Sequence, residues 1–325
     1  MGITAFIGAY GYGNLGDELC LMEAMHAFPA EEARAFSVDP DWTMRCVPGL
    51  AGCFADGAAM LALRPRRVVY GGGMFGTSEA FRAWMPWLVQ AEAQGAEIHF
   101  HNLGVASLGR DLGWLDAAAN GVFVRAAGFT VRDYLSIERA IEGGIARTPR
   151  LTFFPEAELP ADPSLAEALL PRDRRLLGVS IIPSPLMREA LRHEAALVHA
   201  LLTEFEGHAV VPIVSTVHLH APEEDDMEGC AAFLRDFLPR AEIAAPLLLD
   251  RAHWRAELTP ARLKGLIARC DTLVTHRKHN AVHAIGAGVR TIGLHPLEDH
   301  SLRRTFVTLC NRLPPGSRCV GLLSP

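Results

Sequence analysis

The chain has 325 residues, a formal net charge of -6 and a hydrophobic content of 50%. With roughly 100 to 200 residues per domain, this length predicts two domains, and the apolar content excludes a chain that is mostly disordered. The acidic balance excludes the broad basic stripe that a nucleic-acid-binding protein usually presents, so we expect no nucleic-acid partner.

The sequence contains no window of about 18 uninterrupted apolar residues, and no basic segment precedes its first apolar run. We therefore expect a cytoplasmic protein without a transmembrane segment. Its seven cysteines, an odd number without any C-x-x-C pair, indicate neither a disulfide framework nor a zinc knuckle. The sequence leaves the oligomeric state open, a homo-oligomer included.

Short β-branched runs alternate with longer amphipathic stretches, which is typical of βα units and a mostly parallel sheet. The expected strands span Ile3 to Gly8, Ala33 to Val38, Arg67 to Tyr70, Glu97 to Asn102, Phe129 to Val131, Leu151 to Phe154, Leu176 to Ile182, Ala209 to Val214, Glu242 to Ala244, Thr272 to Thr275 and Arg290 to Leu294. Four prolines and several charges between Pro155 and Arg175 indicate a linker.

We therefore predict an α/β protein of two doubly wound, Rossmann-like domains that face each other across a cleft. Residues 1–160 form the first domain, which carries the glycine-rich turns, and residues 172–300 form the second. Residues 301–325 are expected to form a helix and a tail, and the helix could pack back on the domain junction. Ligands bind at the carboxyl ends of the strands in such sheets, so the motifs should gather there.

The first motif, GAYGYGNLGDE from Gly8 to Glu18, follows the first strand and has G-x-G-x-x-G spacing. Such a turn lets backbone N–H groups approach a phosphate. Asp17 and Glu18 begin the next helix, where they would either compete with that phosphate or simply complement the helix dipole. Asn14 tolerates a positive φ and suits the turn itself. Asp39, after the second strand, could hold the ribose of NAD and keeps a dinucleotide site open.

The second motif, VVYGGGMFG from Val68 to Gly76, ends an apolar strand in three consecutive glycines. Bare backbone at Gly72 and Gly73 would allow a ligand or the facing domain to approach closely. A tight turn without a ligand is the alternative.

The third motif, FTVRDYLS from Phe129 to Ser136, ends a short strand in Arg132 and Asp133. Asp133 is placed to cap a helix that runs to Gly143. Arg132 could bind a carboxylate or phosphate of a substrate, or it could pair with Asp133 or Glu156.

The fourth motif, DTLVTHRKHNAVHAIGAGVRTIGL, starts at Asp271, and its polar cluster from His276 to His279 opens a helix after a strand. Cations at a helix N-terminus oppose the dipole, so their presence there predicts a bound anion, with Arg277 and Lys278 as ligands. A solvated surface is the alternative. The spacing of His276, His279 and His283 could hold a metal, but no acidic or cysteine residue is adjacent, and we expect no metal.

In their order, these motifs resemble those of the polysaccharide pyruvyl transferase family. Residues 11–18 match the G-x-G-N-x-G-D-E turn of that family, residues 71–73 its Gly-Gly-Gly strand end, residues 132–136 its R-D-x-x-S element and residues 277–279 its R-x-H helix start. The resemblance spans residues 3 to 295. Lys278 stands where the family commonly has Leu, and Glu156 where it often has Asp, which leaves the acceptor and the donor preference open.

The resemblance implies a GT-B-like fold and transfer of a pyruvyl group from phosphoenolpyruvate to a sugar of a glycan or glycan precursor, as a ketal. Phosphoenolpyruvate would be the donor substrate, and no cofactor is expected. Arg277 would bind the donor, and His279 would act as an acid or a phosphate ligand. Asp17, as a base, and Glu18 with Asn14 would work on a saccharide acceptor, which could be lipid-linked.

Three other functions stay open. A glycosyltransferase of the same two-domain shape would use a nucleotide sugar in the same cleft. An NAD-dependent oxidoreductase rests on the glycine spacing and on Asp39. A binding protein that keeps the fold without activity rests on the departures at Lys278 and Glu156.

Overall fold

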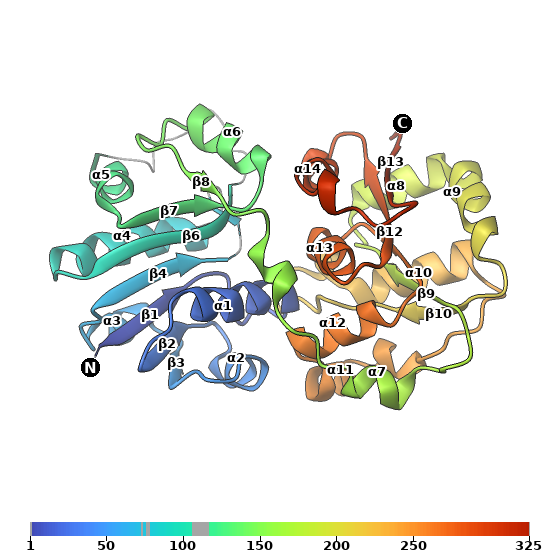
Figure 1. Cartoon of the computed structure of the whole chain (residues 1–325), viewed down its shortest axis with the longest axis horizontal. Coiled ribbons are helices and arrows are strands. Elements are labelled where there is room, and N and C mark those ends of the chain that lie inside the picture. The colour runs from blue at the N-terminus through green and yellow to red at the C-terminus, as the bar shows by residue number, and fades with distance from the viewer. Residues whose placement is uncertain (1, 73, 76–78, 106–116, 325) are drawn as a thin grey trace. The chain divides into compact units, whose positions relative to one another are not determined.

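The computed structural model describes residues 2–72, 74–75, 79–105 and 117–324 (Figure 1). The chain divides into two compact units. The first contains Met1–Tyr12 and Asp17–Glu156, and the second contains Gly13–Gly16 and Ala157–Pro325. Each unit is built on one parallel sheet, which confirms the prediction of two α/β domains.

The first unit has a sheet of eight strands, and every described pair of neighbours in it is parallel. Its strands are β1 (Ile3–Ile7), β2 (Glu32–Phe36), β3 (Gly52–Phe54), β4 (Arg67–Gly71), β5 (Met74–Phe75), β6 (Glu97–Val105), β7 (Gly128–Val131) and β8 (Arg150–Leu151). Seven lie in the order β3-β2-β1-β4-β6-β7-β8, and β5 pairs with β6. The chain builds outward from β1 in one direction and from β4 in the other, so the switch point of this doubly wound sheet lies between β1 and β4.

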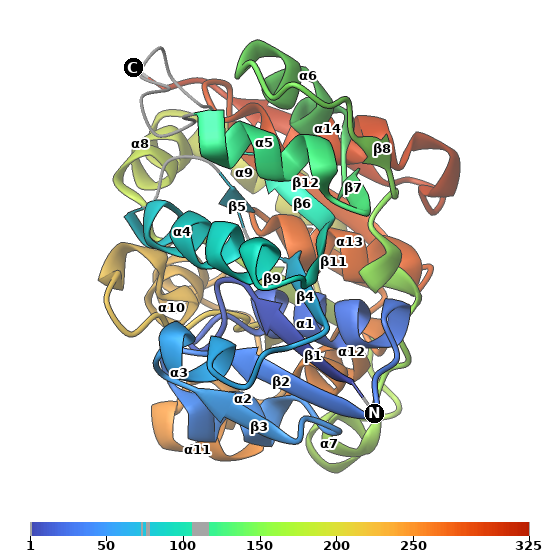
Figure 2. The same cartoon turned by 90° about the vertical axis from the view of Figure 1, so that its left-hand side faces the viewer.

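Helices cover this sheet and bury its apolar strands. They are α1 (Leu15–Ala27), α2 (Pro40–Cys46), α3 (Gly57–Leu61), α4 (Glu79–Ala93), α5 (Ala117–Arg125) and α6 (Tyr134–Glu142), followed by the 3-10 turn η1 (Pro155–Glu158). Figure 2 shows α4 and α5 side by side. Beneath them, the rings of Phe100 on β6 and Phe123 on α5 stack with centroids 4.0 Å apart. Burial of the strands among helices explains their nearly continuous apolar sequences.

The second unit has a five-stranded parallel sheet in the order β10-β9-β11-β12-β13. Its strands are β9 (Leu176–Ser180), β10 (Ala209–Pro212), β11 (Thr272–Thr275), β12 (Arg290–Pro296) and β13 (Arg318–Leu322). Its helices are α7 (Ser164–Leu169), α8 (Pro185–His193), α9 (Ala195–Leu202), α10 (Asp226–Phe237), α11 (Arg251–Glu257), α12 (Pro260–Ala268), α13 (Lys278–Gly286) and α14 (His300–Thr308), with 3-10 turns η2 (Thr203–Phe205), η3 (Pro222–Glu224), η4 (Pro246–Leu249) and η5 (Cys310–Arg312). The switch point of this sheet lies between β9 and β11.

Two features of the second unit differ from the expected elements. The stretch from Glu242 to Ala244 forms only an isolated bridge, between Ile243 and Val210, instead of a strand. The expected C-terminal helix is α14, but the tail after it forms β13, an edge strand beside β12. Neither β13 nor the short β3 was predicted, because both are brief, contain glycine and lack a long apolar run.

From Ala157 onward, the segment predicted to be a linker is part of the second unit. The buried Lys264 on α12 donates from Nζ to the carbonyls of Ala157, at 3.0 Å, and Leu159. At Gly265 a Cβ atom would lie 2.0 Å from the Asp162 carbonyl oxygen, so only glycine lets α12 approach this segment. Residues 157–162 are therefore packed against α12 within the second unit.

Among the described residues, no helix is both long enough and apolar enough to cross a bilayer.

Candidate functional site

The switch point of the first unit is filled by the chain's own groups. Tyr10, which follows β1, is fully buried, and its hydroxyl donates to the carbonyl of Gly71 at the end of β4. A Cβ atom on Gly8 would lie 2.4 Å from the same carbonyl oxygen, so the two strand ends almost touch. These groups occupy the place where a Rossmann fold holds the pyrophosphate of a dinucleotide.

The glycine-rich turn receives a carboxyl group from within the protein. The N–H of Gly11 donates to Oε1 of Glu18 at 2.6 Å, and the hydroxyl of Thr43 donates to the same oxygen at 3.2 Å. Glu18 is fully buried, and this burial raises the pKa of its carboxyl to about 8, although the Gly11 bond acts in the opposite direction. These contacts give Glu18 a structural role in closing the turn.

The residue that could have bound the ribose of NAD caps a helix. Asp39 is the N-cap of α2, and its side chain accepts the N–H of Trp42 at 3.1 Å. With Gly11 engaged by Glu18, both features behind the dinucleotide hypothesis have a structural explanation.

The second glycine motif packs against α1. Gly72 has a φ of 77°, and a Cβ atom there would lie 2.5 Å from Cβ of Cys20. Close packing therefore requires this glycine, whether or not a ligand approaches it. Gly73, the other glycine proposed to bind a ligand, lies outside the described residues. Asp17, one turn before Cys20 on α1, is buried and 9% exposed.

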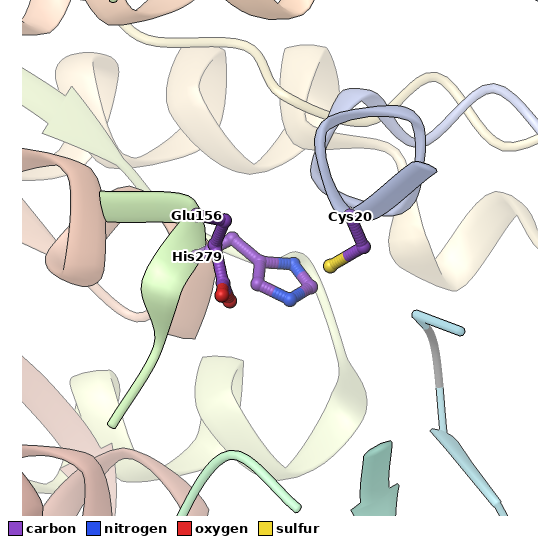
Figure 3. A group of neighbouring side chains, drawn as sticks. All are labelled: Cys20, Glu156 and His279. Atoms are coloured by element: carbon purple, nitrogen blue, oxygen red, sulfur yellow. The ribbon is translucent and has the colours of Figure 1, made fainter. Parts of the chain in front are cut away.

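Figure 3 shows Cys20 on α1 and Glu156 on η1, together with His279 of the second unit. The sulfur of Cys20 lies within 4.8 Å of a carboxylate oxygen of Glu156. Burial, followed by the charge of Glu156, raises the pKa of the Cys20 thiol well above its usual value. The thiol therefore stays neutral, and a neutral thiol is neither a good nucleophile nor a good metal ligand.

Arg132 forms part of a buried charge cluster in the first unit. Its side chain is 1% exposed and its Nε lies 4.0 Å from Oδ2 of Asp133. A Cβ atom on Gly104 would lie 2.2 Å from the guanidinium, so this glycine makes room for it. Glu156 is fully buried, and its Oε2 accepts a hydrogen bond from Nδ2 of Asn102 at 2.7 Å. Burial raises the pKa of Glu156, and the charge of Arg132 lowers it. This interaction corresponds to the alternative in which Arg132 pairs with Asp133 or Glu156 instead of a substrate.

The rest of the third motif acts as the sequence indicated. Asp133 is the N-cap of α6, which ends at the C-cap Gly143. Its Oδ1 accepts the N–H of Ser136 at 2.7 Å and the Ser136 hydroxyl at 2.6 Å. The predicted helix cap is confirmed.

At the switch point of the second unit, Arg277 is held by the protein's own acids. Its Nε donates to Oδ1 of Asp226 at 2.7 Å, and its NH1 lies 3.3 Å from Oε2 of Glu224, whose carbonyl accepts from NH2. Asp226 is fully buried, whereas the Glu224 side chain is 47% exposed. Burial raises the pKa of Asp226 and Arg277 lowers it. Neither acid was expected from the sequence, although both lie in the run EEDD at residues 223–226.

A second polar network shares Asp226 with this ion pair. Asn280, in the first turn of α13, donates from Nδ2 to the hydroxyls of Ser180 at 2.7 Å and Ser215 at 3.1 Å. Ser215 in turn donates its N–H and hydroxyl to Oδ2 of Asp226, at 3.0 and 2.8 Å. The Oδ1 of Asn280 is buried and has no hydrogen-bond partner among the described residues. The network ties the start of α13 to the carboxyl ends of β9 and β10.

The tip of the first glycine motif belongs to the second unit. Leu15 N–H donates to the Ser215 carbonyl at 2.9 Å, and Asn14 bridges Thr216 in the antiparallel sense. Oδ1 of Asn14 accepts the Gly16 N–H at 3.0 Å and the Thr216 hydroxyl at 3.3 Å. The expectation that the whole turn lies in the first domain is therefore wrong for Gly13–Gly16.

This segment also reaches the histidine proposed to be catalytic. A Cβ atom on Gly16 would lie 2.2 Å from Nδ1 of His279, so the glycine allows the imidazole to rest on the backbone. Within one unit, Asn14, Gly16 and His279 are thus brought close to one another.

The first turn of α13 begins without a side-chain cap. The N-cap is Arg277, whose side chain makes no capping hydrogen bond, and Lys278 and His279 are half-buried. A helix N-terminus without a side-chain cap, with cationic residues in its first turn, favours a bound anion.

The two remaining histidines of the fourth motif have partners or surroundings of their own. His276 is buried and its Nε2 lies 3.5 Å from Oδ2 of Asp299, and this histidine is the main cause that lowers the pKa of Asp299 to about 2. Burial, followed by the charge of Lys264, lowers the pKa of His283 to about 3. His283 is therefore a neutral core residue.

Comparisons with solved structures support the fold. The UDP-GlcNAc 2-epimerase of Methanocaldococcus jannaschii matches 99% of this chain and 89% of its own, with 12% identity and a TM-score of 0.55. The same enzyme in complex with UDP-GlcNAc and UDP matches equally well, with 11% identity, 99% and 89% coverage and a TM-score of 0.55. The epimerase of Neisseria meningitidis bound to UDP-GlcNAc matches 98% of this chain and 87% of its own, with 8% identity and a TM-score of 0.54. At such low identity these similarities establish the GT-B-like fold.

No protein-family model matches the chain, and no curated protein matches it by sequence.

Proposed function

We propose that this protein is a sugar-processing enzyme, and specifically a pyruvyl transferase that moves the pyruvyl group of phosphoenolpyruvate onto a sugar as a ketal. The observation that carries the proposal is the start of α13, an uncapped helix N-terminus at a switch point with Lys278 and His279 in its first turn. The four motifs that resemble the polysaccharide pyruvyl transferase family support it. So does the similarity in fold to enzymes that bind a nucleotide sugar.

The donor binds through groups that can exchange partners. Phosphoenolpyruvate carries a phosphate and a carboxylate, and Lys278, His279 and the N–H groups of the α13 turn supply one anion site. Glu224 is the exposed partner of Arg277, whereas Asp226 is the buried one. The second anionic group of the donor therefore replaces Glu224 at the guanidinium, while Asp226 keeps Arg277 in place.

The reaction needs one proton delivered to carbon and two removed from hydroxyls. The enol CH₂ carbon accepts a proton to become the methyl group, and His279 is the assigned acid because an imidazole exchanges protons near neutral pH. One sugar hydroxyl adds to the neighbouring carbon, and a second displaces phosphate from it. Two hydroxyl protons leave in these steps, one restoring His279 and one leaving with phosphate or solvent. Asp17 is assigned as the base on the strength of the resemblance.

Calorimetry on the purified chain tests the donor. Phosphoenolpyruvate should bind, and His279→Ala should lower the rate of phosphate release from phosphoenolpyruvate and a sugar mixture more than it lowers donor affinity. Equal losses in both would make His279 a binding residue only. An absence of donor binding to the wild-type chain would exclude the proposal.

A nucleotide-sugar enzyme is the second candidate, because structures of the same fold have been solved with UDP-GlcNAc and UDP. Titration with UDP and with UDP-GlcNAc in the same calorimeter separates the two functions. Binding of either nucleotide in preference to phosphoenolpyruvate would favour this candidate.

A further inference from the structure

The second unit contains a cavity that the proposed reaction does not use. Its volume is about 720 Å³, and it lies between α8, the start of α9 and α10, next to the chain leaving β9. This size falls in the range of roughly 300 to 1,000 Å³ that small-molecule sites occupy. No residue of α13 lines it.

The floor of the cavity is apolar. Ile181, Leu191 and Phe233 line it and are 2%, 6% and 2% exposed. Pro183 and Phe237 extend the same surface. These side chains carry no hydrogen-bonding group, so the floor suits an aliphatic body better than a nucleobase or a ribose, which need polar partners.

One wall of the cavity is fixed by a glycine. A Cβ atom on Gly229 of α10 would lie 1.9 Å from the Ile181 carbonyl oxygen. Glycine within a helix is destabilising by itself, so its presence here marks a close approach that the fold requires. The distance between α10 and the end of β9 is therefore set by backbone contact.

The rim of the cavity carries an excess of positive charge. Arg188 and Arg192 lie one turn apart on α8, and both are exposed. Among the described residues neither forms an ion pair, whereas Arg235 across the cavity pairs with Asp236 at 3.0 Å. Glu228 is the other acid of the lining. Like charges at this helical spacing repel each other, so an anion between them would stabilise both.

We propose that this cavity binds a lipid phosphate, with the aliphatic chain on the apolar floor and the phosphate between Arg188 and Arg192. A saccharide acceptor carried on such a lipid would explain the site, and only this last step rests on the proposed function. The binding site itself follows from the second unit alone.

Titration of the full chain with decyl phosphate, below its micelle concentration, tests the site. Decyl phosphate should bind at least about 10-fold more tightly than inorganic phosphate, decanol or uridine monophosphate. The double variant Arg188→Gln with Arg192→Gln should weaken decyl phosphate binding about 10- to 100-fold, as expected for two lost charge-assisted bonds. The matched control, Arg172→Gln with Arg303→Gln, removes two exposed arginines outside the cavity and should bind as the wild type does.

A cavity-filling variant tests the floor separately. Ala232→Phe, on the α10 wall, should abolish binding of decyl phosphate while circular dichroism shows an intact fold. Unchanged affinity in the double arginine variant, or tighter binding of uridine monophosphate than of decyl phosphate, would overturn the proposal. Phosphoenolpyruvate binding, measured on the same variants, should be unaffected. Loss of the lipid site and failure of the donor assignment are therefore distinguishable.

Discussion

The carboxyl of Glu18 accepts the backbone N–H of Gly11 at 2.6 Å, so the glycine-rich turn at the end of β1 is closed by the helix that follows it. A phosphate in this turn would have to displace a fully buried side chain. Glycine spacing that is typical of a dinucleotide site therefore serves, in this protein, to bring the backbone to an internal acid.

Replacement of Glu18 by Gln should change how stability depends on pH. The pKa of Glu18 is raised from 4.5 to about 8 in the folded state, mainly by burial. The folded protein therefore binds the proton of the Glu18 carboxyl more tightly than the unfolded chain does. This proton binding stabilises the fold fully below about pH 4.5, and the stabilisation is lost as the pH rises toward 8. The loss is about 1.4 kcal/mol per pH unit across that window.

Urea unfolding at pH 5 and pH 8 measures this effect. The wild type should lose more stability between these two values than Glu18→Gln does, because the amide does not titrate. Parallel losses in both proteins would show that Glu18 titrates as an exposed carboxyl does.

Glu224→Gln should strengthen donor binding. The Glu224 carboxylate lies 3.3 Å from NH1 of Arg277, where it would compete with an incoming anion. Without the charge of Glu224, phosphoenolpyruvate should bind about 2- to 5-fold more tightly, since a partly exposed pair contributes roughly 0.5 to 1 kcal/mol. The matched control is Glu223→Gln, which removes the same charge one residue earlier. Equal gains in both variants would indicate a general electrostatic effect instead of competition.

Arg277→Ala should affect folding as well as binding. Asp226 would then be left fully buried without its ion-pair partner, and breaking such a pair is destabilising by about 3 to 5 kcal/mol. The double variant with Asp226→Asn should recover part of that loss, because the neutral amide has a smaller desolvation penalty. Urea denaturation of the four proteins of this cycle gives the coupling energy. Additive losses would mean that the pair contributes nothing to stability.

Much of the fold follows from local sequence. The apolar runs at Ile3 to Ile7 and Thr272 to Thr275 predict buried strands because parallel strands are covered on both faces. Asp133 predicts the start of a helix because a carboxylate satisfies the free N–H groups of a first turn. By contrast, β13 depends on a neighbouring strand edge that only the tertiary structure supplies.

The candidate site was harder to predict because its partners are distant in sequence. Arg277 is recognisable as a cation at a strand end, but the acid that holds it is 51 residues away. Asn14 and Thr216, 202 residues apart, meet only because the tip of the first turn joins the second unit. A sequence pattern reports the residue type at each position, whereas pairing of this kind is decided by how the elements pack.

Gly16→Ala tests whether the position of His279 matters for the proposed reaction. The new Cβ atom would lie 2.2 Å from Nδ1 of His279, so either the imidazole or the backbone must move. We expect kcat for pyruvyl transfer to fall by 10-fold or more, because displacing a catalytic group by about 1 Å has effects of that order. A stability loss of about 1 to 3 kcal/mol should accompany it, as for other overpacked sites. Steady-state kinetics and urea unfolding measure the two effects.

Gly121→Ala on α5 is the control, because a Cβ atom there meets only the flexible end of Arg125, at 2.8 Å, which can move aside. If Gly16→Ala kept full activity, the imidazole would not need its observed position, and His279 would lose its assignment as the acid.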